Sequence, residues 1–282
     1  HDEGDFLMNM AFKSDSTGVL RRYVGDSVYA WQEGIRHLCI PLEDKAYLII
    51  FDWCDIADTS KTEERVTVFC NEKDFVLISD NLGLPETEGE SDKTSSMRML
   101  EMFFNMLIEG DIDTLDAMED EFGVLEEELI TSKELKKDTG TRIVIFKRTL
   151  LKMKRYYEQL SAVADMLALD EAEAMPKKLK NRFVALSHRI DHLEATVAHL
   201  REYVTQIREA YQAQIDIEQN QIMKIFTVIT AIFLPLSLIV GWYGMNFAMP
   251  EYGWKFGYLF VIIFSVAVCC FMYRFIKRKR WF

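Results

Sequence analysis

Several features common in enzymes and secreted proteins are missing from this 282-residue chain. It has no nucleotide-binding loop of the GxxxxGK[ST] type and no catalytic constellation, so we do not expect an enzyme. Its cysteines are odd in number and lack ligand-like spacing, which indicates reduced thiols in a cytosolic and membrane setting. We assign no resident cofactor and no metal ligand from the sequence, and no feature points to nucleic acid.

An apolar signal peptide is also missing, because residues 1–10 are acidic and lack an apolar core of the needed length. The chain carries a net charge of −12, but its last nine residues are strongly basic, with Arg274, Lys277, Arg278, Lys279 and Arg280. Basic residues beside a membrane span favour the cytoplasmic side. We therefore expect an inner- or plasma-membrane protein with both termini in the cytoplasm.

Two long apolar runs near the C-terminus are typical of membrane spans. The first, residues 225–243, contains nineteen residues, which as a helix would extend roughly 28 Å and cross the hydrocarbon core of a bilayer. The second, residues 256–273, follows a short polar connection. A mean hydropathy of −0.04 for the whole chain conceals these runs, since the preceding residues are rich in polar side chains. The sequence predicts a hairpin of two spans.

A helix of unusual length is expected to lead into the first span. Residues 177–213 contain no glycine or proline, and the helix can continue through Asn220 as far as Gly244. Its apolar residues alternate in spacings of four and three, which predicts a heptad seam packed against partner helices. We expect this seam to hold an oligomer together. It comprises Leu186, Ile190, Leu193, Val197, Leu200, Val204, Ile207 and Tyr211.

The region before this helix changes from strand-like to helical patterns. Residues 46–53, 65–70 and 75–79 are predicted strands, with residues 71–74 as a hairpin loop, and residues 18–24 are a candidate edge strand. Residues 28–38 fit either a strand or a helix. Residues 97–130, with a kink at Gly110, and residues 142–175 have helical periodicity.

The predicted fold class is therefore a membrane protein with an N-terminal mixed α/β cytoplasmic domain, a very long stalk and pore helix, and two C-terminal transmembrane helices. The predicted boundaries are a β-rich part of the cytoplasmic domain at 1–92, cytoplasmic helices at 93–176, a stalk helix at 177–224, a first, pore-lining span at 225–247, an external loop at 248–255, a second span at 256–276 and a basic tail at 277–282.

The C-terminal third resembles the CorA family of magnesium channels. The resemblance is carried by Tyr243-Gly244-Met245-Asn246-Phe247, by Met249-Pro250-Glu251 and by the basic tail, with Pro235, Asn220 and Trp254-Lys255 in matching places. It implies a homopentamer that passes Mg²⁺, with Co²⁺ and Ni²⁺ as further candidate ions. It also implies that the first span lines the pore and that Gly244, Met245 and Asn246 form a selectivity filter at the outer mouth.

The chemistry of these residues suits a strongly hydrated cation. Mg²⁺ gives up its water reluctantly, and a ring of Asn246 carboxamide oxygens can accept hydrogen bonds from the intact water shell. Asn220, Thr227, Thr230, Leu234, Ser237 and Gly241 recur at near-helical spacing and are candidate pore-lining residues. Glu251 is a candidate for attracting cations, and the acidic residues of 111–128 are candidates for a regulatory Mg²⁺ site.

Simpler interpretations of the same residues remain open. Gly244-Met245-Asn246 can be an ordinary helix end, and Thr227 and Thr230 can bond to their own backbone. Glu251 and the acidic residues of 111–128 can be solvated surface groups. The whole chain can also be a related Zn²⁺ transporter or a non-conducting, membrane-anchored coiled-coil scaffold. Asn246 favours Mg²⁺, and the small polar residues of the first span argue against a plain anchor.

Overall fold

The computed structural model describes residues 8–13, 38–42, 45–86, 95–131, 136–245 and 253–278. By its internal contacts the chain divides into an N-terminal unit, His1–Arg208, and a C-terminal unit, Glu209–Phe282. The predicted fold class is confirmed. The elements are β1 (Met8–Phe12), β2 (Leu38–Leu42), β3 (Ala46–Trp53), β4 (Glu64–Cys70), β5 (Asp74–Ile78), α2 (Ser96–Leu107), α3 (Asp111–Thr131), α4 (Thr139–Leu169), α5 (Lys177–Tyr243) and α6 (Gly257–Arg278).

The strands form one mixed sheet in the order β1-β5-β4-β3-β2, in which only β1 and β5 pair in parallel. The interior strand β3 has the predicted bounds, and its first six residues are buried, as expected for a continuous apolar run. Between β4 and β5, the Asn71 carboxamide oxygen accepts the backbone N–H groups of Lys73 and Asp74 at 2.8 and 2.6 Å. This bond pattern fixes the tight turn of the predicted hairpin.

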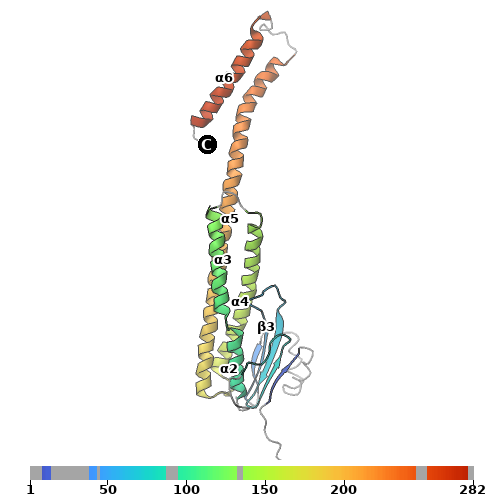
Figure 1. Ribbon diagram of the computed structural model, residues 1–282, viewed down its shortest axis with the longest axis vertical. Helices are drawn as coiled ribbons and strands as arrows, with labels where there is room; N and C mark the ends of the chain where they lie inside the picture. Colours follow the sequence, from blue (N-terminus) through green and yellow to red (C-terminus); the bar gives the residue numbers. More distant parts are fainter. Residues whose placement is uncertain are drawn as a thin grey trace, which may run out of the picture. The chain divides into compact units, whose positions relative to one another are not determined.

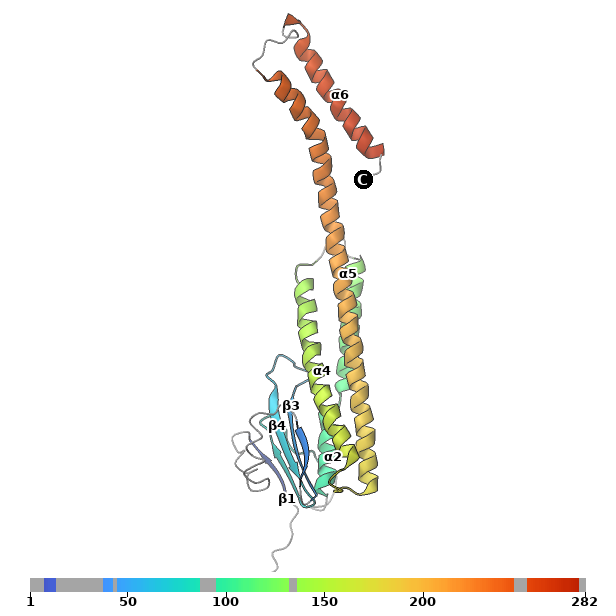
Figure 2. The same ribbon diagram turned by 180° about the vertical axis from the view of Figure 1, so that it is seen from behind.

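Helices α2 and α4 contact the sheet, and α3, α4 and the first part of α5 lie side by side in both views (Figures 1 and 2). Side chains connect these helices in pairs. Phe122 of α3 contacts Phe146 of α4, with 4.8 Å between ring centroids. The Tyr203 hydroxyl of α5 donates to Glu126 of α3 at 2.7 Å, and Ser187 of α5 donates to Asp165 of α4 at 2.5 Å.

The heptad seam of α5 is buried inside this bundle. From Leu186 to Ile207 its members are at most 5% exposed in the single chain, while Tyr211 is partly buried. The expectation that the seam joins subunits is therefore wrong. The chain supplies the partner helices itself, because α3 and α4 provide the apolar surface that the seam covers.

Two predicted helices end earlier than expected. The helix predicted over 97–130 is two helices, because Gly110 adopts a left-handed φ of 77° that breaks the hydrogen-bond ladder between α2 and α3. The helix predicted to reach Met175 stops at Leu169. There Asp170, at φ 53°, accepts the Tyr47 hydroxyl and the backbone N–H groups of Ala174 and Met175, which closes a turn before Pro176.

Other strand predictions have different outcomes. Strand β1 and most of β2 were not predicted, since their apolar runs are short and β2 contains Pro41. The candidate edge strand at 18–24 and the ambiguous segment 28–37 lie outside the described residues.

Replacing Leu200 by alanine should destabilise the N-terminal unit by about 2–5 kcal/mol, because the side chain is fully buried and its removal leaves a cavity. The matched control is Ala198→Ser on the exposed face of the same helix, which should change little. Thermal unfolding of the detergent-solubilised chain measures both. Equal melting temperatures for Leu200→Ala and the parent would contradict burial of the seam within one chain.

Candidate functional site

The C-terminal unit presents an apolar surface that the chain itself does not cover. The described part of the chain has two helices apolar and long enough to cross a bilayer, α5 and α6, whose most apolar windows have mean hydropathies of 2.2 and 2.4. Almost none of this surface is buried, with Leu234 70% and Leu238 71% exposed. Such a surface is stable only in lipid or against other subunits.

The first of these helices ends immediately before the Gly-Met-Asn sequence. Helix α5 stops at Tyr243, and the Gly244 backbone N–H still donates to the Val240 carbonyl at 2.9 Å. A Cβ atom at position 244 would lie 3.0 Å from that same carbonyl oxygen. A side chain here would therefore press against the last helical turn. Glycine, which has no side chain, avoids this close contact.

Six candidate pore residues lie on the same side of α5. Asn220, Thr227, Thr230, Leu234, Ser237 and Gly241 are all exposed in the single chain. At 3.6 residues per turn they fall within an arc of about 100° of the helix surface. The structure therefore gathers them on one face of the helix.

The hydroxyl groups of the two threonines on this face already donate hydrogen bonds within the helix. Thr227 Oγ1 donates to the Met223 carbonyl and Thr230 Oγ1 donates to the Phe226 carbonyl, each at 2.8 Å. This is the backbone bonding expected of hydroxyl residues in a span. It also leaves each oxygen with free lone pairs, so the hydroxyls can accept hydrogen bonds from water or from a hydrated cation.

The remaining site residues are placed only in part. Gly244 and Met245 are exposed beyond the end of α5. Asn246 and Glu251 lie outside the described residues. The basic end of the chain is described as far as Arg278, with Lys277 and Arg278 in the last turn of α6.

A buried carboxylate at the start of α3 was not found by sequence reasoning. Asp111 is 7% exposed and accepts the Tyr157 hydroxyl of α4 at 2.8 Å. Burial raises the pKa of Asp111 to about 6, and nearby Asp55 adds to the rise, although the bond from Tyr157 opposes it. The neighbouring Tyr156 hydroxyl is buried without a hydrogen-bond partner among the described residues. The only sequence signal was an acidic residue directly after Gly110.

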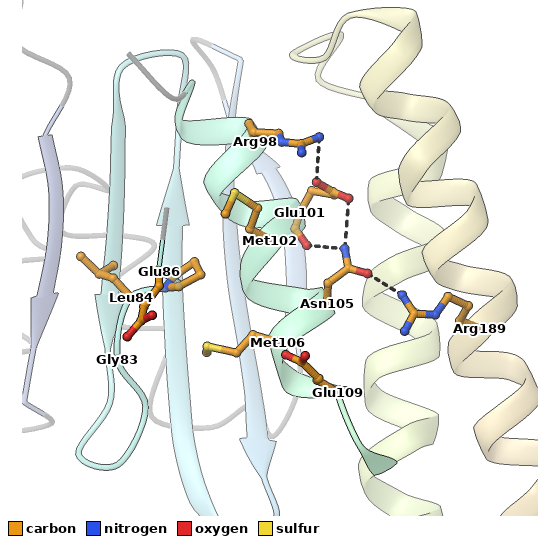
Figure 3. Close-up of a pocket in the computed structure, with 11 residues that line it drawn as sticks. Gly83, Leu84, Glu86, Arg98, Glu101, Met102, Asn105, Met106, Glu109 and Arg189 are labelled. Atoms are coloured by element: carbon orange, nitrogen blue, oxygen red, sulfur yellow. Dashed lines mark hydrogen bonds and ion pairs between the residues drawn. The ribbon is translucent and has the colours of Figure 1, made fainter. Parts of the chain in front are cut away.

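A second unpredicted feature is a pocket of about 760 Å³ between the segment 83–86, α2 and α5 (Figure 3). Glu101 of α2 lies within 3.3 Å of Arg98 and 3.6 Å of Arg182, and the Arg189 guanidinium donates to the Asn105 carboxamide oxygen at 2.6 Å. Arg182 and Arg189 are seven residues apart on α5. Because residues seven apart lie on the same face of a helix, this spacing could have indicated that the two arginines contact the same neighbouring helix.

Together, a mixed sheet with a helical bundle, a 67-residue helix and two uncovered apolar helices define a membrane protein with C-terminal spans. Residues 63–278 match the family described as CorA-like Mg²⁺ transporter protein. The match covers more than half of the sequence, and the chain belongs to that family.

Individual relatives agree with this assignment. The cobalt/magnesium transport protein CorA of Thermotoga maritima is 30% identical over 184 residues, which are 65% of this chain and 52% of the relative. The magnesium transport protein CorA of Escherichia coli K12 is 42% identical over 93 residues, 32% of this chain and 29% of the relative. The alignment thus spans about half the length of the first relative and less of the second.

A solved structure agrees in fold. The CorA magnesium transporter from Methanocaldococcus jannaschii has a TM-score of 0.77 at 21% identity, covering 97% of this chain and 90% of that one. At this identity the likeness shows the fold alone.

Replacing Asp111 by asparagine should stabilise the protein at neutral pH, because it removes a charge that burial disfavours and keeps an acceptor for Tyr157. The raised pKa means that the folded state binds the proton more tightly than the unfolded state. The stabilising effect of the protonated carboxyl is therefore complete below about pH 4 and is lost as the pH rises to about 6.

The free energy of unfolding of Asp111→Asn relative to the parent should therefore increase between about pH 4 and about pH 6. The increase is at most about 3 kcal/mol, since one unit of pKa corresponds to about 1.4 kcal/mol. Melting temperatures of the full chain between pH 4 and pH 8 measure it, with the exposed Asp116→Asn as control. A parent protein that gains stability over the variant as the pH rises would contradict this account.

Proposed function

We propose that this chain forms a homopentameric channel through which Mg²⁺ enters the cytoplasm, with Co²⁺ and Ni²⁺ as further candidate ions. The observation that carries the proposal is the polar face of α5 in an otherwise apolar span, leading to Gly244-Met245-Asn246 at the helix end. Membership of the CorA-like family supports it, and so do the two relatives, which are a cobalt/magnesium and a magnesium transport protein.

In this proposal the first span lines the pore and the ion travels with its water. The Thr227 and Thr230 oxygens, whose protons are bound to the helix backbone, act as acceptors for the protons of the hydration shell. Ser237 and Asn220 extend the same face, and Leu234 supplies an apolar constriction that can close the pore by excluding water. The Asn246 ring selects the hydrated ion at the outer mouth, and Glu251 attracts cations to it.

The same proposal places the N-terminal unit and both termini on the cytoplasmic side of an inner or plasma membrane. The basic residues at the end of α6 favour this orientation. Gating then depends on the N-terminal unit, because α5 is a single helix that begins in that unit and ends at the filter. A Zn²⁺ transporter is the nearest alternative, and competition between the two metals in a flux assay separates them.

Asn246→Leu should abolish Mg²⁺ flux into liposomes while leaving the assembly intact, because leucine offers no acceptor for the hydration shell. Asn246→Asp should bind cations more tightly and lose selectivity for Mg²⁺. Hexaamminecobalt(III), which resembles hydrated Mg²⁺ but cannot shed its ligands, should block entry from outside. Normal flux through the leucine variant, with the oligomer unchanged by light scattering, would remove Asn246 from the filter.

Millimolar Mg²⁺ should raise the melting temperature more than Na⁺ does at equal ionic strength if a regulatory divalent ion binds between subunits. The reason is the net charge of −12 per chain, because bringing five such chains together creates repulsion that a specific divalent site relieves. Equal effects of the two salts would show that screening is sufficient and that no such site is needed.

A further inference from the structure

The faces of α3 and α4 that point away from the bundle carry a second heptad pattern. On α3, Asp113, Ala117, Asp120, Val124, Glu127 and Thr131 are spaced four and three residues apart and are all exposed; we name these residues the α3 outer seam. The α4 outer seam has the same spacing and is also exposed: Val144, Arg148, Leu151, Arg155, Glu158 and Ala162. Residues four and three apart lie on one face of a helix, so each set forms a continuous exposed stripe.

The two outer seams are opposite in charge. The whole of α3 has nine acidic residues and no basic one, whereas residues 139–156 of α4 have six basic residues and no acidic one. Within the described ranges, Asp113, Asp120, Arg148 and Arg155 make no ion pair inside the chain, although Arg142 pairs with Glu121 and Glu128. Complementary charge is thus held at the surface without a partner.

Apolar residues separate these charges along each seam. Val124 is 55% exposed on α3, and Val144 and Leu151 are 51% and 40% exposed on α4. In a helix that faced only water, these positions would favour polar residues. Their alternation with unpaired charges fits a contact that contains apolar and ionic pairs in turn.

The register of the hairpin shows which residues lie at the same level. Helices α3 and α4 are antiparallel neighbours, and Asp111 contacts Tyr157 while Phe122 contacts Phe146 (Figures 1 and 2). Continuing this register places Arg155 level with Asp113, Leu151 with Ala117, Arg148 with Asp120, and Val144 with Val124. If neighbouring copies are related by rotation about an axis parallel to the helices, each residue keeps its height along that axis. In a cyclic assembly the two aspartates of these four levels would therefore lie opposite arginines, and the two apolar residues of α3 opposite apolar residues of α4.

We propose that neighbouring subunits pack the α3 outer seam of one copy against the α4 outer seam of the next. The partner is a second copy of this chain, and the contact is head-to-tail, so repetition closes a ring. Asp113 pairs with the neighbour's Arg155 and Asp120 with the neighbour's Arg148, with Ala117 on Leu151 and Val124 on Val144 between them. The inference rests on the proposed function only in assuming a cyclic homo-oligomer.

Cysteine crosslinking of the full chain tests the contact. In a background with Cys269→Ser and Cys270→Ser, Ala117→Cys combined with Leu151→Cys should give a ladder of crosslinked species up to the full ring under copper-phenanthroline oxidation. Each single variant should give none, because a head-to-tail contact joins different positions. The matched control combines Ala117→Cys with Ala162→Cys on the same seam, which lies eleven residues, or about 16 Å, out of register and should give no ladder.

Charge reversal provides the second arm. Arg148→Glu with Arg155→Glu should reduce the crosslinked fraction about tenfold, and adding Asp113→Arg with Asp120→Arg should restore it, because the pairs are then exchanged rather than lost. All four positions are exposed, so the fold should survive.

The outcomes separate this proposal from the proposed function. An oligomer that conducts Mg²⁺ under reducing conditions but forms no ladder with the 117/151 pair overturns the outer-seam contact and leaves the channel standing. Equal ladders from the 117/151 and 117/162 pairs also overturn it, since they show random collision. A ladder confined to the 117/151 pair in a protein without flux supports the contact and counts against the channel.

Discussion

The structure depends on one helix, α5, whose two parts have different environments. In the N-terminal unit α5 needs only a narrow apolar seam, because α3 and α4 of the same chain cover it and the other faces meet water. In the C-terminal unit, residues 225–243 of the helix are mostly apolar, and the described residues bury none of its most apolar window. The change takes place within a continuous helix of 67 residues without a break at the boundary. The bundle and the apolar hairpin both follow from this requirement.

Several hydrogen bonds and ion pairs connect neighbouring helices of the N-terminal unit. Arg182 and Arg189 of α5 contact Glu101 and Asn105 of α2, and Tyr203 bonds to Glu126 of α3. These contacts lie beside the apolar seam, so each helix is held in one register by hydrogen bonds that an apolar contact alone would not specify. The surface charges have a different arrangement, with acidic residues on α3 and basic residues on α4. The N-terminal unit therefore buries its apolar seam within one chain and keeps charges of opposite sign on the exposed faces of α3 and α4.

At the candidate site, two interpretations of the same residues turn out to be compatible. The hydroxyls of Thr227 and Thr230 donate to the helix backbone, as in any span, yet each oxygen keeps lone pairs that can accept hydrogen bonds. Gly244 fits a helix end because a side chain would press on the Val240 carbonyl. Because α5 ends at Tyr243, Met245 is exposed, and Asn246 follows it in the sequence. The contacts that these residues make within the helix are therefore compatible with the roles proposed for them in the channel.

Periodicity and hydropathy by themselves determined the long helix, the two spans and strands β3, β4 and β5, since each rests on a local pattern of apolar residues. The family followed from the resemblance carried by the contiguous motif around Gly244-Met245-Asn246. Sequence could not show that the seam of Leu186 to Ile207 is covered by the same chain, because a heptad pattern requires a partner helix without identifying it. It also predicted only a kink at Gly110, where the chain breaks into two helices, and it missed the end of α4 before Asp170. The first depends on a left-handed backbone, and the second on bonds from Tyr47 and from the turn before Pro176. Only the tertiary structure showed that Asp111 is buried against Tyr157 and which residues of α3 and α4 lie side by side. Burial and helix register depend on residues far apart in the chain.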